Sequence, residues 1–267
     1  MPQILNPFVD KAPDEVPLPN APLVRVLMQT QFSPILRIGE ASGIISFQEA
    51  IRQDYPELTS GQSEAIQLAV GPGGMTQAPV RTATRVWQFI DADQSWRVGL
   101  STESVSLEAL KYSSRTEFLK RAKDVLDAVF DHFHPAQAHR VGLRYINSLG
   151  EKYVDEIQKF IRPELSLLLT PDIVQAATHS VGDMRVTTTE GNLQLRYGLL
   201  PPSGTVDPDL MPPIGEKRWF LDMDLFQEGA RPFNSSSITK MLTASAGRIY
   251  TVFRWAATPA LLDEFRK

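Results

Sequence analysis

Strand-like segments occur in runs along this chain, and each run is followed by a long amphipathic helix. The first run ends at Ser114, which forms a capping box with Glu117 at the start of a helix with one apolar stripe. The second run ends at the serines of 235–237, which precede another helix with an apolar face. Strands in runs, rather than strands alternating singly with helices, predict an α+β fold. We expect antiparallel sheets with the long amphipathic helices packed on one face.

One strand-like segment also has a partial echo. Residues 140–147 read R-V-G-L-R-Y-I-N and residues 193–200 read L-Q-L-R-Y-G-L-L, so Arg-Tyr lies near the centre of each. Together with the order of elements, this echo suggests two related halves. The expected divisions are a Pro-rich extended lead-in over residues 1–22, a first α+β half over 23–150 and a second over 151–267, packed as one compact unit.

Apolar periodicity and turn residues place the individual elements. Strands are predicted over residues 23–32, 85–91, 96–101, 104–110, from 140 onward, and over 176–186, 193–200 and 218–226. Helices are predicted over 47–55, 114–133, 153–161, 235–253 and 259–265. A Pro-rich surface loop is predicted over 201–215, either as a lid or as a spacer.

Composition and charge exclude several classes of protein. The 267 residues carry a formal net charge of -4, without the basic excess of a general phosphate-backbone binder, so nucleic acid is a disfavoured partner. The absence of cysteine excludes disulfides, thiolate metal sites and a cysteine nucleophile. No segment is apolar over the ~20 residues of a membrane span, and the N-terminus does not have the pattern of a signal peptide. We expect a cytoplasmic protein without a membrane partner.

No motif for catalysis, for a cofactor or for a metal ion emerges, so none of these is expected. His132 and His134 lie near His139, but two residues at the end of one helix point about 200° apart around its axis. Their place in the last helical turn has a simpler cause, because histidine is favourable at a helix C-terminus.

The candidate binding residues lie on two strands. Arg140 and Arg144 share one face of their strand, whereas Tyr145 and Asn147 share the other. The arginines either fork a carboxylate or phosphate of a ligand, or pair with acids of a neighbouring strand. Asp222 and Asp224 alternate along a further strand and therefore share a face. They are either a paired acid site or part of a solvated strand face.

The chain resembles a sporadically distributed, functionally uncharacterised bacterial family. The resemblance rests on L-P-N-A-P-L-V at residues 18–24, the strand around Trp87, the helix around Phe118, and R-V-G-L-R-Y-I-N at residues 140–147. It implies an accessory protein of patchy occurrence, as is typical of defence, toxin–antitoxin or mobile-element systems. It carries no catalytic residue over to this chain.

Three functional hypotheses follow. The first is a non-catalytic protein-binding or regulatory module that contacts another protein through exposed Arg140 and Arg144 and the Pro-rich segments. The alternative is an enzyme or sensor with a pocket between sheet and helices, in which Arg144, Tyr145, Asp222 and Asp224 bind a small anionic or metal-bound ligand. A third hypothesis is nucleic-acid binding through a basic strip on the first long helix, formed by Arg115, Lys120, Arg121 and Lys123.

Overall fold

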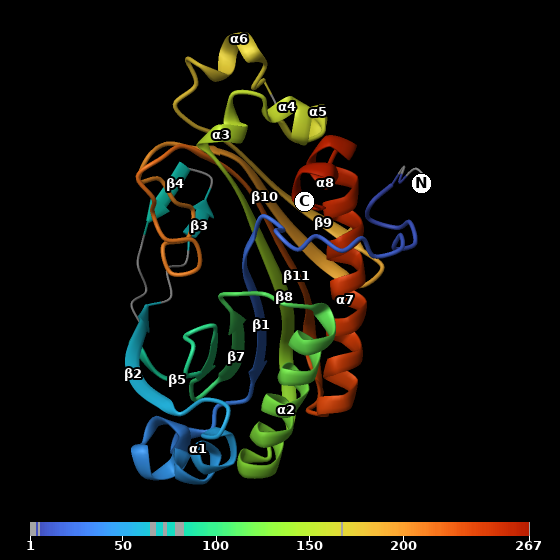
Figure 1. Ribbon diagram of the computed structural model, residues 1–267. Coiled ribbons are helices and arrows are strands. Elements are labelled where there is room, and N and C mark those ends of the chain that lie inside the picture. The colour runs from blue at the N-terminus through green and yellow to red at the C-terminus, as the bar shows by residue number, and fades with distance from the viewer. Residues whose placement is uncertain are drawn as a thin grey trace.

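Most strands of the described residues belong to one large sheet. The computed structural model describes residues 4, 6–64, 68–71, 74–77, 83–166 and 168–266. The strands are β1 (Leu23–Phe32), β2 (Glu57–Glu64), β3 (Leu68–Gly71), β4 (Gly74–Gln77), β5 (Ala83–Ile90), β6 (Trp96–Leu100), β7 (Ser104–Ala109), β8 (Gln137–Gly150), β9 (Ser180–Thr188), β10 (Gly191–Leu200) and β11 (Arg218–Pro232). In the described part of the chain, nine of them form an antiparallel sheet in the order β2-β5-β6-β7-β1-β8-β11-β10-β9, and β3 pairs with β4 separately (Figure 1).

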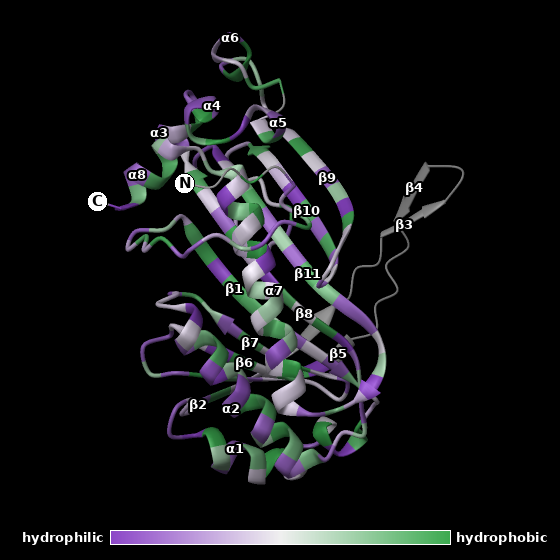
Figure 2. Cartoon of the chain, turned by 90° about the vertical axis from the view of Figure 1, so that its right-hand side faces the viewer, coloured by the Kyte–Doolittle hydropathy of each residue, from purple (hydrophilic) through white to green (hydrophobic). Residues whose placement is uncertain are grey.

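Helices complete an α+β architecture, as the sequence predicts. They are α1 (Ile45–Ile51), α2 (Arg115–Phe133), α3 (Glu151–Val154), α4 (Ile157–Phe160), α5 (Pro163–Ser166), α6 (Pro171–Val174), α7 (Ser235–Ala256) and α8 (Pro259–Arg266), with short 3-10 helices at Leu36–Gly39 and Ala41–Ile44. Figure 2 looks onto the side of the sheet where α7 crosses the strands, with α1 and α2 at one end and α3 to α6 at the other.

The two longest helices begin at side-chain caps. The Ser114 hydroxyl accepts a hydrogen bond from the Glu117 amide at 3.1 Å, which confirms the predicted start of α2. Asn234 caps α7, because its side-chain oxygen accepts from the Ser237 amide at 2.8 Å. The cap of α7 is therefore one residue earlier than the serines of 235–237. Each helix buries apolar residues against the strands, and α2 and α7 also contact each other.

The N-terminal strap, residues 6–22, lies against α7. Arg248 of α7 donates hydrogen bonds to the carbonyls of Pro7 and Asp10, both at 2.7 Å. The Val16 amide donates to the Tyr250 hydroxyl at 2.7 Å. These main-chain contacts dock a Pro-rich segment that forms no helix or strand of its own. Residues 1–3 and 5 of the predicted lead-in lie outside the described residues.

Several elements differ from the predicted ones. β2 was not predicted, because E-L-T-S-G-Q-S-E at Glu57–Glu64 is too polar to read as a strand. The helix predicted over 153–161 is two short helices, α3 and α4. The expected division between residues 150 and 151 does not separate two sheets. β8, which ends at Gly150, pairs with β1 on one side and with β11 on the other.

The two Arg-Tyr segments of the sequence echo occupy different places in the sheet. β8 lies between β1 and β11, near the centre, whereas β10 lies one strand in from the edge strand β9. The echo of residues 140–147 and 193–200 therefore does not mark equivalent strands.

Candidate functional site

The side chains of the sheet divide into an apolar face and a polar face. On β11, Trp219, Leu221 and Met223 are buried on the side of the helices. The alternate residues Asp222 and Asp224 point to the opposite side, which we call the open face. Charged and amide side chains of the neighbouring strands continue across this face, because each strand of the sheet alternates in the same way. The open face therefore carries the polar groups that are available for a site.

Asp222 is the centre of one charged cluster on the open face. Its side chain is 2% exposed, and its two oxygens accept hydrogen bonds from Arg144 Nε and Nη2, both at 2.8 Å. Arg196 adds two further hydrogen bonds to Asp222 Oδ2, at 3.1 and 2.7 Å. Arg144 also donates to Asp207 at 2.8 Å. Burial lowers the pKa of Arg144, but the hydrogen bonds and charges of Asp222 and Asp207 outweigh burial and raise it. Asp222 is thus saturated by protein donors.

Arg140 and Asp224 form a neighbouring pair. Arg140 Nη2 lies 2.9 Å from Asp224 Oδ2, and the guanidinium lies over the Phe226 ring at 4.5 Å from its centroid. Burial raises the pKa of Asp224, and the charges of Arg140 and Arg144 oppose this effect. The arginines of the central signature are therefore neutralised by acids of the neighbouring strand, which was one of the two readings of the sequence.

A second charged cluster lies on the β6–β7–β1 side of the open face. Glu108 Oε2 accepts from Arg25 Nη1 at 3.0 Å and lies 3.8 Å from Arg97 Nη1. The Nε atoms of Arg25 and Arg97 are buried without a hydrogen-bond partner among the described residues. Burial raises the pKa of Glu108, and Arg25 and Arg97 oppose this effect. This cluster is less completely hydrogen-bonded than the one around Asp222.

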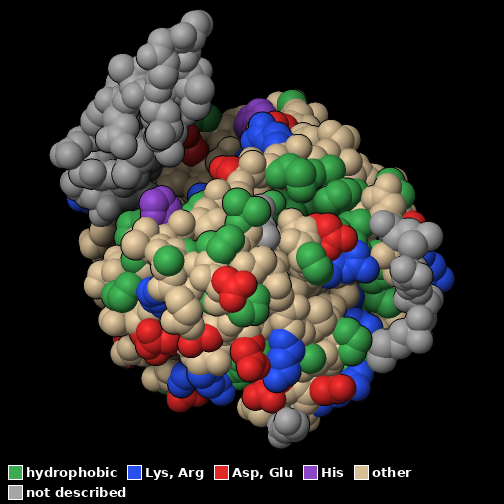
Figure 3. All heavy atoms as spheres, turned by 90° about the horizontal axis from the view of Figure 1, so that it is seen from above, with side chains coloured by type: hydrophobic (Ala, Val, Ile, Leu, Met, Phe, Trp, Pro, Cys, Tyr) green, Lys and Arg blue, Asp and Glu red, His purple; other side chains and the backbone are tan. Residues whose placement is uncertain are grey.

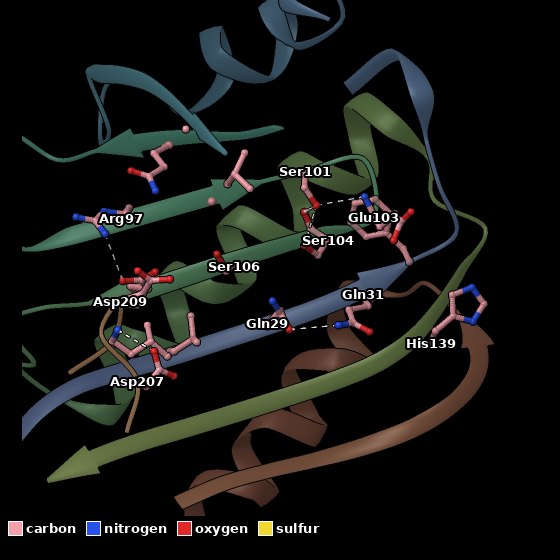
Figure 4. A pocket seen from close by; sticks show the side chains of 18 of the residues that line it. Gln29, Gln31, Arg97, Ser101, Glu103, Ser104, Ser106, His139, Asp207 and Asp209 are labelled. Atoms are coloured by element: carbon pink, nitrogen blue, oxygen red, sulfur yellow. Dashed lines mark hydrogen bonds and ion pairs between the residues drawn. The ribbon is translucent and has the colours of Figure 1, made fainter. Parts of the chain in front are cut away.

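A hollow of about 750 Å³ opens beside the Glu108 cluster (Figure 4). Directly opposed residues of β5, β6, β7 and β1 form its floor: Gln88, Gly99, Ser106 and Gln29. A Cβ at Gly99 would lie 2.5 Å from the Ser106 hydroxyl, so glycine keeps the middle of this floor flat. The remaining polar lining comes from Gln31, Arg97, Ser101, Glu103, Ser104, Glu108, His139, Asp207 and Asp209.

The hollow is acidic. Among the described residues that line it, four are carboxylates, namely Glu103, Glu108, Asp207 and Asp209, and Arg97 is the one guanidinium. Two of these carboxylates are ion-paired, because Glu108 contacts Arg25 and Arg97, and Asp207 contacts Arg144. The lining therefore offers amides and hydroxyls on its floor, and negative charge at its margins comes from Glu103 and Asp209.

The 201–217 loop, which joins β10 to β11, forms one wall of the hollow. Met211 of this loop is buried in a small apolar cluster with Ile146, Leu200 and Phe220 of the open face. Arg218 Nη2 donates to the carbonyls of Gly204, Met211 and Pro212. The loop is thus docked on the open face over β8, β10 and β11.

The structure separates the predicted binding residues into two groups. Arg140, Arg144, Asp222 and Asp224 come together on the open face, but Arg140 and Arg144 are ion-paired rather than exposed, with side chains 20% and 12% exposed. Tyr145 and Asn147 lie on the helix side, where they line a different cavity. The alternative site that joins Tyr145 to Arg144, Asp222 and Asp224 is therefore not assembled.

The other charged candidates have local partners. On α2, Arg115 pairs with Glu15, Arg121 with Glu117 and Lys123 with Asp127, so neighbouring acids oppose the basic strip. On the end of the molecule seen in Figure 3, acidic and basic side chains are interspersed.

His139 of the predicted histidine cluster is within hydrogen-bond distance of the Ser33 hydroxyl, at 2.8 Å. In the described part of the chain, no group of three or more His, Asp or Glu side chains is placed to hold a metal ion.

Sequence reasoning missed the residues of the hollow. Gln29, Gln88 and Ser106 are uncharged, lie on three strands and belong to no motif. Only the sheet register brings them side by side. Glu108 and Arg97 do give a signal in the sequence, because a charged residue within an otherwise apolar strand needs a partner. Their presence predicts a charged cluster on this side of the sheet.

Comparison with known proteins adds no relative. No protein-family model matches the chain, and neither the curated proteins nor the solved structures contain a match. The family resemblance drawn from the sequence stays a prediction. Within the described residues, no helix combines the length and apolarity that a membrane crossing requires.

Proposed function

We propose that this protein is a non-catalytic accessory protein that binds an extended segment of a partner protein in the hollow of its open face. The observation that carries the proposal is the hollow itself, with its floor of amides and hydroxyls and its acidic margins. Amide and hydroxyl side chains bind peptide groups by hydrogen bonds, and their floor spans four strands. The defence, toxin–antitoxin or mobile-element setting implied by the resemblance is part of this proposal.

An internal repeat supports the proposal. We infer two related halves, in which β1, β6, β7 and α2 correspond to β8, β10, β11 and α7. Trp96–Leu100 reads W-R-V-G-L and Leu195–Leu199 reads L-R-Y-G-L. The register agrees, because Arg97 lies opposite Glu108 as Arg196 lies opposite Asp222.

The second arginine of each charged cluster, Arg25 in one and Arg144 in the other, also lies at an equivalent position. Glu108 lies opposite Leu27, and Arg25 is two residues before Leu27. Asp222 lies opposite Ile146, and Arg144 is two residues before Ile146. Each half therefore holds an acid between two arginines at equivalent positions, which independent strands have no reason to share.

The repeat explains why the described residues leave this surface open in one half. In the second half, Phe220 lies opposite Gly198 and is covered by the 201–217 loop. In the first half, Ser106 lies opposite Gly99, and only Thr102 and Glu103 with Ser101 connect β6 to β7. This connection is too short to cover the sheet. A chain segment covers the surface in one half, and we propose that a partner's segment covers the equivalent surface in the other.

Charge complementarity sets the chemistry of the partner segment. The carboxylate of Asp209 favours a segment with a lysine or arginine side chain beside it, whereas Glu108 is already paired with Arg25 and Arg97. In the first half, Ser106 stands at the position of Phe220 and Ser101 at the position of Leu200. These serines favour a polar segment over an apolar one. Nucleic acid is a poorer occupant, because phosphates would face the carboxylates.

Peptide selection with a plugged variant tests the proposal. We would select a displayed library of random 12-residue peptides against the wild-type protein and measure the affinity of enriched peptides by fluorescence anisotropy. Ser106→Phe fills the floor of the hollow, and the fold is expected to accept it because Phe220 occupies the equivalent place opposite a glycine. Thr187→Phe on the exposed strand β9 is the matched control.

We expect the enriched peptides to contain lysine or arginine and to bind more weakly as salt is raised. Ser106→Phe should weaken binding at least tenfold, or about 1.4 kcal/mol, and Thr187→Phe should leave it unchanged. Asp209→Lys should weaken binding by charge reversal. Equal affinity for wild type and Ser106→Phe, or a selection that yields no binder, would contradict the proposal.

A further inference from the structure

A second cavity, of about 420 Å³, lies on the helix side of the sheet. The N-terminal strap forms one wall, through residues 15–19 and Ala21. The residues before and at the start of α2, from Tyr112 to Arg115, form another wall, and α7 contributes Ile249 and Phe253. Sheet residues form the floor. The volume lies within the ordinary range of small-molecule sites.

The walls are largely apolar, and a few polar groups lie among them. Leu18, Leu23, Met223, Ile249 and Phe253 supply apolar surface. The polar groups gather at the floor, where β8 presents Tyr145 and Asn147 and the residues before α2 present Tyr112. Apolar walls with a small set of convergent polar groups are typical of pockets that orient a ligand.

Asn147 has unused hydrogen-bonding capacity. The residue is 6% exposed, and its amide nitrogen makes one long hydrogen bond to the Leu221 carbonyl, at 3.5 Å. Its amide oxygen accepts no hydrogen bond from the described residues. The oxygen is not among the fully buried atoms that lack a hydrogen-bond partner, and the residue lines the cavity. It is therefore an acceptor that a ligand donor in the cavity can reach.

The two tyrosines supply the complementary donor. The hydroxyls of Tyr112 and Tyr145 are 3.4 Å apart, a long contact that leaves a hydroxyl hydrogen free to turn toward a ligand. Burial raises the pKa of both phenols, so they stay protonated at neutral pH. An acceptor at Asn147 and a phenolic donor beside it match an adjacent donor and acceptor on the ligand.

We propose that this cavity binds a small, mostly apolar aromatic molecule with one amide-like edge, which pairs with Asn147 and the hydroxyls of Tyr112 and Tyr145. The apolar body lies between Met223 and Phe253. This site is independent of the hollow, because the two lie on opposite faces of the sheet.

Ligand binding is coupled to the strap. Glu15 of the strap pairs with Arg115 at 2.6 Å, and the Val16 amide donates to Tyr250. Because these contacts hold the outer wall in place, a bound molecule should stabilise the docked strap by mass action. The ligand should therefore protect the strap from proteolysis as well as raise the melting temperature.

A pair of ligands of matched shape tests the site. 2-Quinolinone carries a lactam edge, and naphthalene has the same two fused rings without it. Ligand-observed NMR titrations of the full chain would measure both, with Asn147→Leu removing the amide and Tyr145→Phe removing one hydroxyl. Ser106→Phe, which changes the hollow alone, is the control.

We expect saturable binding of 2-quinolinone to the wild type and to Ser106→Phe, with naphthalene at least tenfold weaker. Asn147→Leu should lower the affinity for 2-quinolinone at least tenfold and leave naphthalene unaffected, which separates a lost contact from a lost fold. Two results would overturn the site: no saturable binding of 2-quinolinone to the wild type, or equal affinities of wild type and Asn147→Leu for it.

Discussion

Asp222 is a buried carboxylate that contacts two arginines. Arg144 donates hydrogen bonds to it from two nitrogens, and Arg196 donates two more. Such a cluster offers a modest net gain in stability, because desolvation of three charges offsets most of their attraction. Removal of one member is different, since it leaves the others buried and unpaired. Asp222 is therefore a structural residue rather than a ligand-binding residue.

Asp222→Ala should lower the free energy of unfolding by about 3–5 kcal/mol, the usual cost of breaking a buried ion pair. Chemical denaturation followed by circular dichroism measures this change. Asp183→Ala is the control on the same face, because Asp183 lies on the edge strand and is exposed. Its loss should cost less than about 1 kcal/mol. A similar small effect for both variants would show that Asp222 does not hold the cluster together.

At the scale of elements, the sequence predicts most strands but not their neighbours. The strand over Leu23–Phe32 and the cap at Ser114 follow from local residues, because β-branched runs and capping oxygens act within a few positions. β2 is an edge strand whose polar side chains carry no apolar alternation. The hollow has no local signal at all, because the pairing of β5, β6, β7 and β1 alone aligns Gln88, Gly99, Ser106 and Gln29.

The strap should loosen in acid. Burial raises the pKa of Glu190, but hydrogen bonds from Arg248 and Thr189 outweigh burial and hold its pKa below the ordinary range. The pair therefore stabilises the protein at neutral pH, and the stabilisation is lost as the pH falls through the folded-state pKa of Glu190. Because Arg248 also binds the carbonyls of Pro7 and Asp10, the strap shares this loss.

Hydrogen exchange of the strap between pH 7 and about pH 3, corrected for intrinsic rates, measures this loosening. We expect strap protection to fall with pH in the wild type, and to be low and nearly independent of pH in Glu190→Gln. Lys240→Ala, at an exposed position of α7, should behave as the wild type does. Equal pH profiles for the wild type and Glu190→Gln would refute the link between Glu190 and the strap.

At the scale of the whole molecule, the repeat that we propose predicts a boundary between halves after α2, whereas the sequence alone suggests one at residue 150. A unit that begins at residue 135 contains β8, β11, β10, β9 and α7, in the same arrangement as β1, β7, β6, β5 and α2 of the first half. A unit that begins at residue 151 lacks β8. In that shorter unit β11 loses a neighbour along its whole length, and Asp222 loses Arg144.

Division of the chain at the two positions distinguishes these boundaries. Residues 135–267 should be recovered with native-like circular dichroism and should form a 1:1 complex with residues 1–134, because β1 and β8 re-pair along their registered edges. Residues 151–267 should be unfolded alone, since removal of β8 takes away the strand that pairs with β11 and uncovers apolar surface of α7 that packs on β8. Far-UV circular dichroism and thermal melts of the two fragments at equal concentration measure the difference. If residues 151–267 folded as stably as residues 135–267, β8 would not belong to the second unit, and the correspondence between Arg25–Glu108–Arg97 and Arg144–Asp222–Arg196 would be a coincidence of register.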